Sequence, residues 1–172
     1  MLHVSRRAFR LILATAALLA CGVPRTFGDD PRVRVQRIID GDTITLEDRR
    51  AVRYIGIDTP EARRKVDGRW VDDPEPFAKA ATAANRRLVD GQLVRLEPDV
   101  QSHDRYGRLL AYVYVQDAQG QELMVNAELL RQGMAQLLTI PPNVKYVEYF
   151  KDAQREAREA KRGLWSDGKV GR

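Results

Sequence analysis

Short apolar segments separated by tight turns constrain the fold of this chain most. Three segments with β-branched residues occur at 33–39, 43–46 and 51–57, and polar turns at Asp40-Gly41 and 47–50 separate them. Two more segments of this kind follow at 93–96 and 109–115. Short strands joined by tight turns, together with a few helices, are typical of a small barrel with helical additions. We therefore predict an α+β domain built on five strands.

Three helices are predicted between and after these strands. Pro76 begins the first, whose apolar residues recur at helical spacing up to Leu88. The second covers Val125–Arg131 and is closed by Gly133, and the third lies near 147–160, with one apolar and one charged face. The other segments are predicted as an exposed charged loop at 63–74 and an extended piece at 135–140.

The net charge of +5 does not by itself indicate a nucleic-acid partner. The chain has 172 residues, with 29 Lys and Arg against 24 Asp and Glu. Residues 1–28 hold four arginines and no acid, so the rest of the chain keeps 29 − 4 = 25 basic residues against 24 acidic ones. A nearly neutral body means that any basic site is a local arrangement.

The first 28 residues are predicted to be a signal peptide, followed by one domain at 29–172. Arginines precede an apolar core at 11–20, and small residues follow it. Arg6-Arg7 fits the twin-arginine export signal, but paired arginines also occur in ordinary signals. Cys21 lies in a loose lipoprotein motif, and only lipidation there would attach the protein to a membrane. The alternative is an N-terminal helix of the domain. We expect export to the periplasm or the medium.

Any metal site in the body must use oxygen ligands. Cys21 is the only cysteine, and His103 is the only histidine after His3. A zinc site with several histidines or thiolates is therefore excluded. Oxygen ligands favour a hard cation such as calcium or magnesium.

Two acidic clusters stand at the ends of apolar strands, at 40–43 and 58–61. Their carboxylates can converge on one cation, with Asp42 and Asp58 as direct ligands and the carbonyl of Thr59 aimed at the same ion. Glu61 follows closely and can accept a proton from water. Taken singly, each cluster is also an ordinary turn sequence.

Two arginines extend this pattern. Arg53 alternates with apolar residues on the third strand, and Arg108 directly precedes the fifth. Phosphodiester hydrolysis builds negative charge on phosphate oxygens, and a guanidinium offers paired donors that match them. A cross-strand salt bridge for Arg53 and a surface charge for Arg108 are the alternatives. The combination of carboxylates and arginines indicates phosphate chemistry.

At these residues the chain resembles the staphylococcal nuclease (thermonuclease) family. The blocks that carry the resemblance lie at 39–46, 52–61, 104–113, 125–133 and 163–165, in the family's order. The resemblance implies an OB-fold five-stranded barrel with three helices. It also implies a calcium-dependent endonuclease that cleaves DNA and RNA with little sequence specificity and leaves 3′-phosphates. No obligate protein partner is evident, and we expect a monomer.

The resemblance also assigns roles to residues. Asp42, Asp58 and the carbonyl of Thr59 correspond to calcium ligands. Asp40 lies outside them and would orient a water on the metal. The general base corresponds to Glu61, and the phosphate-binding pair to Arg53 and Arg108. Arg105 and Tyr106 correspond to residues that bind a terminal phosphate of the substrate. Asn126 and Trp165 correspond to structural positions.

The segment 138–143 departs from the family. The family's prototype has two tyrosines there that cover the nucleotide base, whereas this chain has no aromatic residue. Tyr146, Tyr149 or the basic loop with Trp70 could take their place, and base stacking is worth about 1–3 kcal/mol. Two other functions stay open: an OB-fold module that binds nucleic acid without cutting it, and an exported protein with a structural calcium site.

Overall fold

Five strands close into a barrel, as predicted. The computed structural model describes residues 31–61, 64–71 and 75–166, so the predicted signal peptide lies outside the described residues. The barrel strands are β1 Arg32–Ile38, β2 Thr43–Leu46, β3 Ala51–Tyr54, β7 Leu93–Glu97 and β8 Leu109–Gln116. Strand β1 pairs with β2 and β7, β2 with β3, and β7 with β8. The parallel pairing of β3 with β8 completes the ring and confirms the OB-like α+β fold.

Alternating side chains of the strands fill the barrel. Ile44, Leu46, Val52, Val94 and Val113 are fully buried. Each such side chain contributes roughly 1.5–3 kcal/mol when it leaves water. This packing makes the strands a rigid support for the polar residues at their ends.

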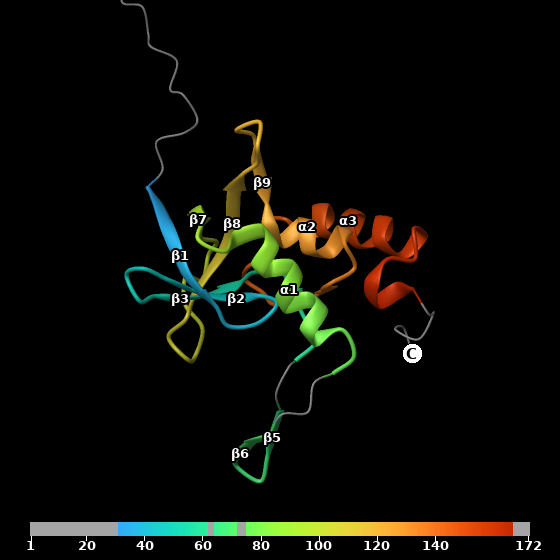
Figure 1. The fold of residues 1–172 in the computed structure, drawn as a ribbon, viewed down its shortest axis with the longest axis horizontal. Helices are drawn as coiled ribbons and strands as arrows, with labels where there is room; N and C mark the ends of the chain where they lie inside the picture. Colours follow the sequence, from blue (N-terminus) through green and yellow to red (C-terminus); the bar gives the residue numbers. More distant parts are fainter. Residues whose placement is uncertain (1–30, 62–63, 72–74, 167–172) are drawn as a thin grey trace, which may run out of the picture.

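Three helices pack on the barrel: α1 Ala78–Val89, α2 Val125–Arg131 and α3 Val147–Glu159. Figure 1 shows α1 crossing in front of the barrel and α2 and α3 side by side at one end. Asn126 of α2 is buried, accepts a hydrogen bond from the Val113 N–H (2.9 Å) and donates one to the Ile55 carbonyl (2.8 Å). Its predicted structural role is therefore confirmed. Trp165, in the 3₁₀ turn η1 Gly163–Trp165, is also buried, as a structural position requires. No helix in the described ranges is long and apolar enough to cross a membrane.

The start of the first helix was predicted wrongly. Helix α1 begins at Ala78, two residues after Pro76, because Phe77 adopts a left-handed conformation (φ 70°). A left-handed residue cannot continue a helix in either direction. Pro76 therefore belongs to the turn that leads into the helix.

The predicted third strand at 51–57 is confirmed over Ala51–Tyr54, but its end was predicted wrongly, because the chain bends after Tyr54. Strand β3 ends at Tyr54, and β4 Ile57–Asp58 pairs with β10 Gln136–Leu137 outside the barrel. Gly56 makes the bend with φ 81°, and a Cβ there would lie 2.4 Å from Phe150 Cε2. The bend carries Asp58 out of the barrel sheet.

The predicted exposed loop at 63–74 contains a hairpin of β5 Arg64–Val66 and β6 Arg69–Val71. Asp67 and Gly68 connect the strands, and both have positive φ, which suits a two-residue hairpin turn. Figure 1 shows this hairpin projecting away from the barrel. A second hairpin extends the barrel, because β9 Glu122–Met124 pairs with β8.

Candidate active site

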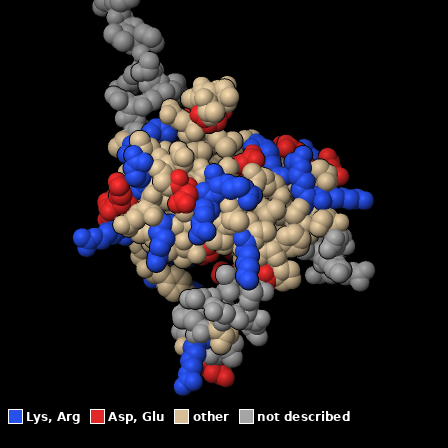
Figure 2. Space-filling model, in the orientation of Figure 1, with Lys and Arg blue, Asp and Glu red and all other residues tan. Residues whose placement is uncertain are grey.

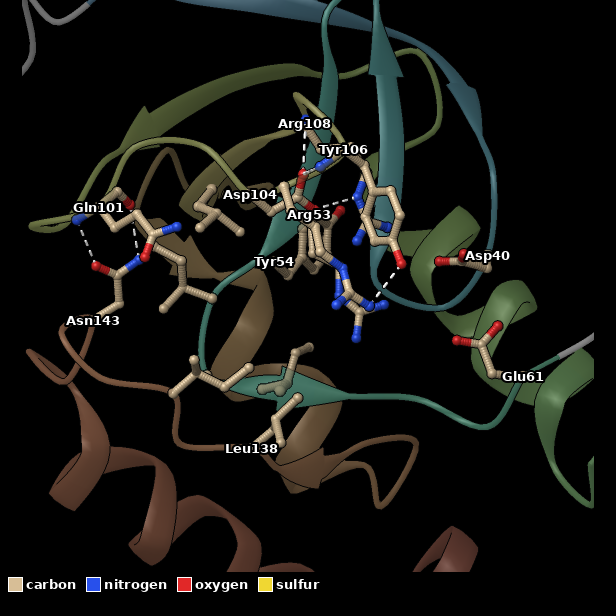
Figure 3. Close-up of a pocket in the computed structure, with 16 residues that line it drawn as sticks. Asp40, Arg53, Tyr54, Glu61, Gln101, Asp104, Tyr106, Arg108, Leu138 and Asn143 are labelled. Carbon is tan, nitrogen blue, oxygen red and sulfur yellow. Dashed lines mark hydrogen bonds and ion pairs between the residues drawn. The ribbon is translucent and has the colours of Figure 1, made fainter. Parts of the chain in front are cut away.

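One open cavity of about 1050 Å³ joins the two groups of residues that the sequence singled out. Figure 3 shows Asp40 and Glu61 on one side of it and the turn with Tyr106 and Arg108 across from them, and Arg53 also lines it. Six predicted residues line the cavity: Asp40, Arg53, Glu61, Arg105, Tyr106 and Arg108. The three predicted metal ligands connect to these residues through Arg53.

Arg53 forms a bridge between the two acidic clusters. Its guanidinium donates to the carboxylate of Asp42 and, at 2.5 Å, to that of Asp58. The antiparallel register of β2 and β3 places Arg53 opposite Thr43, directly beside Asp42. The side chain of Arg53 is only 14% exposed, so the barrel holds the charge in a fixed place.

Asp42 is fully buried and uses both carboxylate oxygens. Oδ2 accepts hydrogen bonds from the N–H (2.9 Å) and hydroxyl (3.1 Å) of Thr59, and Oδ1 accepts one from the hydroxyl of Thr43 (3.2 Å). Burial raises the pKa of Asp42. The close approach of the two clusters requires Gly41, where a Cβ would lie 2.6 Å from Thr59 Oγ1.

Asn85 of α1 holds the first acidic cluster in place, and the sequence analysis missed it. It is fully buried, donates to the carbonyl of Asp40 (3.0 Å) and accepts from the hydroxyl of Tyr54 (2.9 Å). Asp40 in turn accepts a hydrogen bond from the Asp42 N–H through Oδ1 (3.0 Å). The only sequence signal for Asn85 is a polar residue among the alanines of the helix.

Glu61 follows the second cluster, and its backbone is fixed. Its N–H donates to the Glu75 carboxylate (3.1 Å), and its carbonyl accepts from the Glu75 N–H (2.9 Å). Figure 3 shows its carboxylate facing the cavity. Burial and, next, the negative charge of Asp40 raise the pKa of Glu61.

Asp104 organises the turn on the opposite side of the cavity. Its Oδ1 accepts from the N–H groups of Tyr106 (2.8 Å) and Arg108 (3.0 Å), and its Oδ2 accepts from Arg108 Nε (2.6 Å). Arg105 donates to the Tyr106 hydroxyl (2.8 Å). Hydrogen bonds to Asp104 therefore fix the backbone of this turn, while the side chains of Arg105 and Tyr106 are exposed.

A side-chain clamp attaches this turn to the segment before α3. Asn143 accepts a hydrogen bond from the N–H of Gln101 (2.7 Å) and donates one to its carbonyl (2.8 Å). Asn143 is 5% exposed and lines the cavity with Gln101. Residues 42 positions apart make this contact, so no local pattern could have predicted it.

Tyr146 and Tyr149 do not replace the family's tyrosines. The Tyr146 ring packs edge-on against Tyr112 at 4.6 Å, and its hydroxyl donates to Glu97 (2.9 Å). The Tyr149 hydroxyl is bonded to Arg131. Neither lines the cavity, whereas apolar Leu138 and Ile140 do, so this hypothesis is wrong.

The oxygen atoms beside Arg53 fit a hard cation. Two carboxylates already converge on one positive group, and calcium accepts carboxylate, carbonyl and water oxygens in flexible geometry. Within the described residues, no group of three or more His, Cys, Asp or Glu side chains could hold a metal ion. A site here would therefore use the Thr59 carbonyl and water besides Asp42 and Asp58. The donor set fits calcium, and the role of each residue stays a prediction.

The fold and cavity define a small OB-fold domain with a charged cavity on its side. A family model described as "Staphylococcal nuclease homologue" matches residues 51–167. The thermonuclease of Staphylococcus hyicus is 39% identical over 138 residues, which cover 78% of this chain and 75% of that protein. The endonuclease YncB of Bacillus subtilis (strain 168) is 36% identical over 139 residues, or 78% of this chain and 61% of that protein. The chain belongs to the staphylococcal nuclease family.

Proposed function

We propose that this nuclease hydrolyses phosphodiester bonds in DNA and RNA with the help of one calcium ion held by Asp42, Asp58 and the carbonyl of Thr59. The observation that carries the proposal is the single cavity in which Arg53, Arg108 and Glu61 meet. A bound calcium ion would polarise the phosphate as a Lewis acid.

The two arginines, one on β3 and one in the turn before β8, bind the scissile phosphate together. Arg53 is held by the carboxylates of Asp42 and Asp58, and Arg108 by that of Asp104. Their free N–H groups donate to the non-bridging oxygens, where negative charge grows in the transition state. Because guanidinium stays protonated at any working pH, this stabilisation does not depend on a proton transfer.

Glu61 takes the proton from the attacking water. Its backbone is fixed by Glu75, and its carboxylate faces the same cavity as Arg53. Asp40 lines the cavity beside it and orients water by accepting a hydrogen bond. Arg105 and Tyr106 hold a terminal phosphate of the substrate. The water oxygen bonds to phosphorus as the bond to the 5′-oxygen breaks, and the 5′-oxygen takes a proton from solvent, so that the products carry a 3′-phosphate and a 5′-hydroxyl.

The test is cleavage of denatured DNA and of RNA by residues 29–172 in calcium, in magnesium and in excess chelator. We expect cleavage in calcium that chelator abolishes, and none by the Asp42→Ala variant. An Asp48→Ala variant serves as the control, because Asp48 is an exposed acid whose partner among the described residues is Arg50. DNA binding without cleavage in any metal would support the non-catalytic OB-fold module instead.

We also propose that the protein is exported by residues 1–28. The support is the order of arginines, apolar core and small residues in that segment. Cell fractionation of the full chain should find nuclease activity outside the cytoplasm, and an Arg6→Lys/Arg7→Lys variant tests the twin-arginine route. Activity confined to the cytoplasm would refute export.

A further inference from the structure

The outward face of α1 carries a basic stripe, which we define as Lys79, Arg86 and Arg87. All three side chains are exposed, and so is Ala83 between them. The spacing of residues 79, 83, 86 and 87 places them on one side of a helix. Figure 2 shows blue side chains gathered over the position of α1. Because Ala83 is small, nothing on the helix separates the charges from a large ligand.

No acidic side chain among the described residues neutralises the stripe. Across 31–61, 64–71 and 75–166, Lys79, Arg86 and Arg87 have no salt bridge to an acid within 4.0 Å. The exposed basic residues of α3 behave differently, since Lys151 pairs with Glu148 and Arg155 with Asp152, both at 2.7 Å. The positive charge on α1 is therefore available to a partner.

Helix stability does not explain the whole stripe. Positive charges are favourable in the last turn of a helix, where Arg86 and Arg87 lie, and unfavourable in the first turn. Lys79 stands in that first turn, and α1 has no acidic residue there. Its charge opposes the helix dipole there rather than stabilising the helix. A ligand with negative charge would be attracted by all three residues of the stripe.

The stripe is attached to the edge of the cavity. Glu75, just before α1, exchanges two hydrogen bonds with Glu61, and Asn85 on the inner face of α1 is bonded to Asp40. Both Glu61 and Asp40 line the cavity. The distance from Lys79 to Arg87 along the helix is about 12 Å. At an axial spacing of about 3.4 Å per phosphate in one DNA strand, this length covers roughly three to four phosphate steps.

We propose that the basic stripe binds backbone phosphates of the substrate outside the cavity, several nucleotides from the bond that is cleaved. The inference rests on the proposed function, which supplies a polyanionic substrate at the adjacent cavity. The body of the protein is nearly neutral, so attraction of a long strand must come from a local group of charges. The stripe contributes affinity for long nucleic acid without contacting the reacting atoms.

The experiment compares two variants that lose the same charge. The stripe variant is Lys79→Gln/Arg86→Gln/Arg87→Gln. The control is Arg50→Gln/Lys151→Gln/Arg155→Gln, in which each basic residue is exposed and paired with an acid. Binding of a long fluorescent DNA duplex is measured in chelator over a series of salt concentrations, after thermal melting has shown that both variants are folded.

We expect the stripe variant to bind at least about tenfold more weakly at low salt, because three phosphate contacts are lost. The slope of log affinity against log salt should become shallower by about 2 to 3, and the control should match the parent. Equal affinity and slope in the two variants would overturn the proposal.

A single substitution, Lys79→Glu, separates binding from folding. It should weaken duplex binding while leaving the melting temperature equal or higher, because it places an acid in the first turn. Unchanged binding with a higher melting temperature would mean that Lys79 is only a solvated residue. If the parent binds duplex through the stripe but cleaves DNA in no metal, the proposed catalytic function is refuted, and the proposed role of the stripe in binding phosphates is retained.

Discussion

The two sides of the cavity are built differently. On the strand side, Asp42 is fully buried and Arg53 is 14% exposed, and both belong to a network that extends to Thr59 and Asp58. On the loop side, Tyr106 is 69% exposed, and Asp104 organises its turn. The strand side therefore combines folding and chemistry in the same residues, whereas on the loop side the two can be changed separately.

Asp42→Ala should have the largest effect and should damage both properties. It removes a predicted metal ligand and leaves the nearly buried Arg53 with Asp58 as its one remaining carboxylate partner. We expect loss of cleavage and a decrease of about 3 kcal/mol in the free energy of unfolding. Urea unfolding and cleavage assays check this, and Arg53→Met added to Asp42→Ala should recover part of the stability. A free energy of unfolding equal to that of the parent would mean that the hydrogen bonds of Asp42 do not stabilise the fold.

Glu61→Gln should reduce turnover without changing the stability of the fold. The amide keeps the shape of the side chain and cannot take a proton, so turnover should fall by about 10² to 10⁴. The free energy of unfolding should stay within about 0.5 kcal/mol of the parent, because the backbone contacts with Glu75 remain. Turnover close to that of the parent would remove Glu61 from the mechanism.

Arg108→Ala should slow cleavage by about 10² to 10³, lower the free energy of unfolding by less than about 1 kcal/mol, and weaken calcium binding much less than it slows turnover. Its side chain is 31% exposed, and its protein partner is Asp104, so little packing is lost. Arg108→Lys should restore only part of the rate, because an ammonium lacks the paired donors of guanidinium. Single-turnover cleavage and calcium titration measure the two effects. Weaker calcium binding with an unchanged rate would place Arg108 in the metal site instead.

Asn143→Ala tests whether the loop side is independent of the fold. The substitution leaves the N–H and carbonyl of Gln101 without their partner, which costs about 1–2 kcal/mol. We expect turnover to fall by about tenfold, because the turn with Arg108 loses its attachment, while dissociation of calcium is unchanged. Hydrogen exchange of residues 101–108 should increase. An unchanged exchange rate would show that Asp104 alone orders the turn.

The sequence predicted residues whose role can be inferred from local pattern. The sequence shows the acidic turns at strand ends, the arginine between apolar neighbours and the turn before β8. Six of these residues line the cavity, and hydrogen bonds join Asp42, Asp58 and Thr59 to Arg53 or to each other. Asn85 and Asn143 were missed. Each acts through a contact with a residue far away in the chain, and such contacts depend on barrel closure and helix packing.

The errors in the fold have a similar cause. Gly56 lies in the middle of an apolar segment, which the sequence presents as one strand. In the fold its φ is 81°, and the ring of Phe150 leaves no room for a Cβ there. The hairpin at 64–71 has the Asp-Gly turn signal, but its strands are short and highly charged, so composition favoured a loop. In both places one local feature, a tertiary contact at Gly56 and a turn at Asp67-Gly68, decided the structure against the prediction from the composition of the segment.

The smallest expected effect is a pH dependence of stability on the loop side. Burial acts to raise the pKa of Asp104, but hydrogen bonds from Arg108 and the Tyr106 N–H outweigh it, so the pKa lies below its usual value. A carboxyl group with a lowered pKa stabilises the fold above about pH 4, and this stabilisation is lost as the pH falls through the folded value. Because solvent reaches this turn, we expect Asp104→Asn to cost less than about 1 kcal/mol at pH 7 and progressively less as the pH falls below about 4. Urea unfolding of parent and variant at several pH values measures the difference. A difference that stays constant from pH 7 to pH 3 would mean that shape, and not the charge of Asp104, orders the turn.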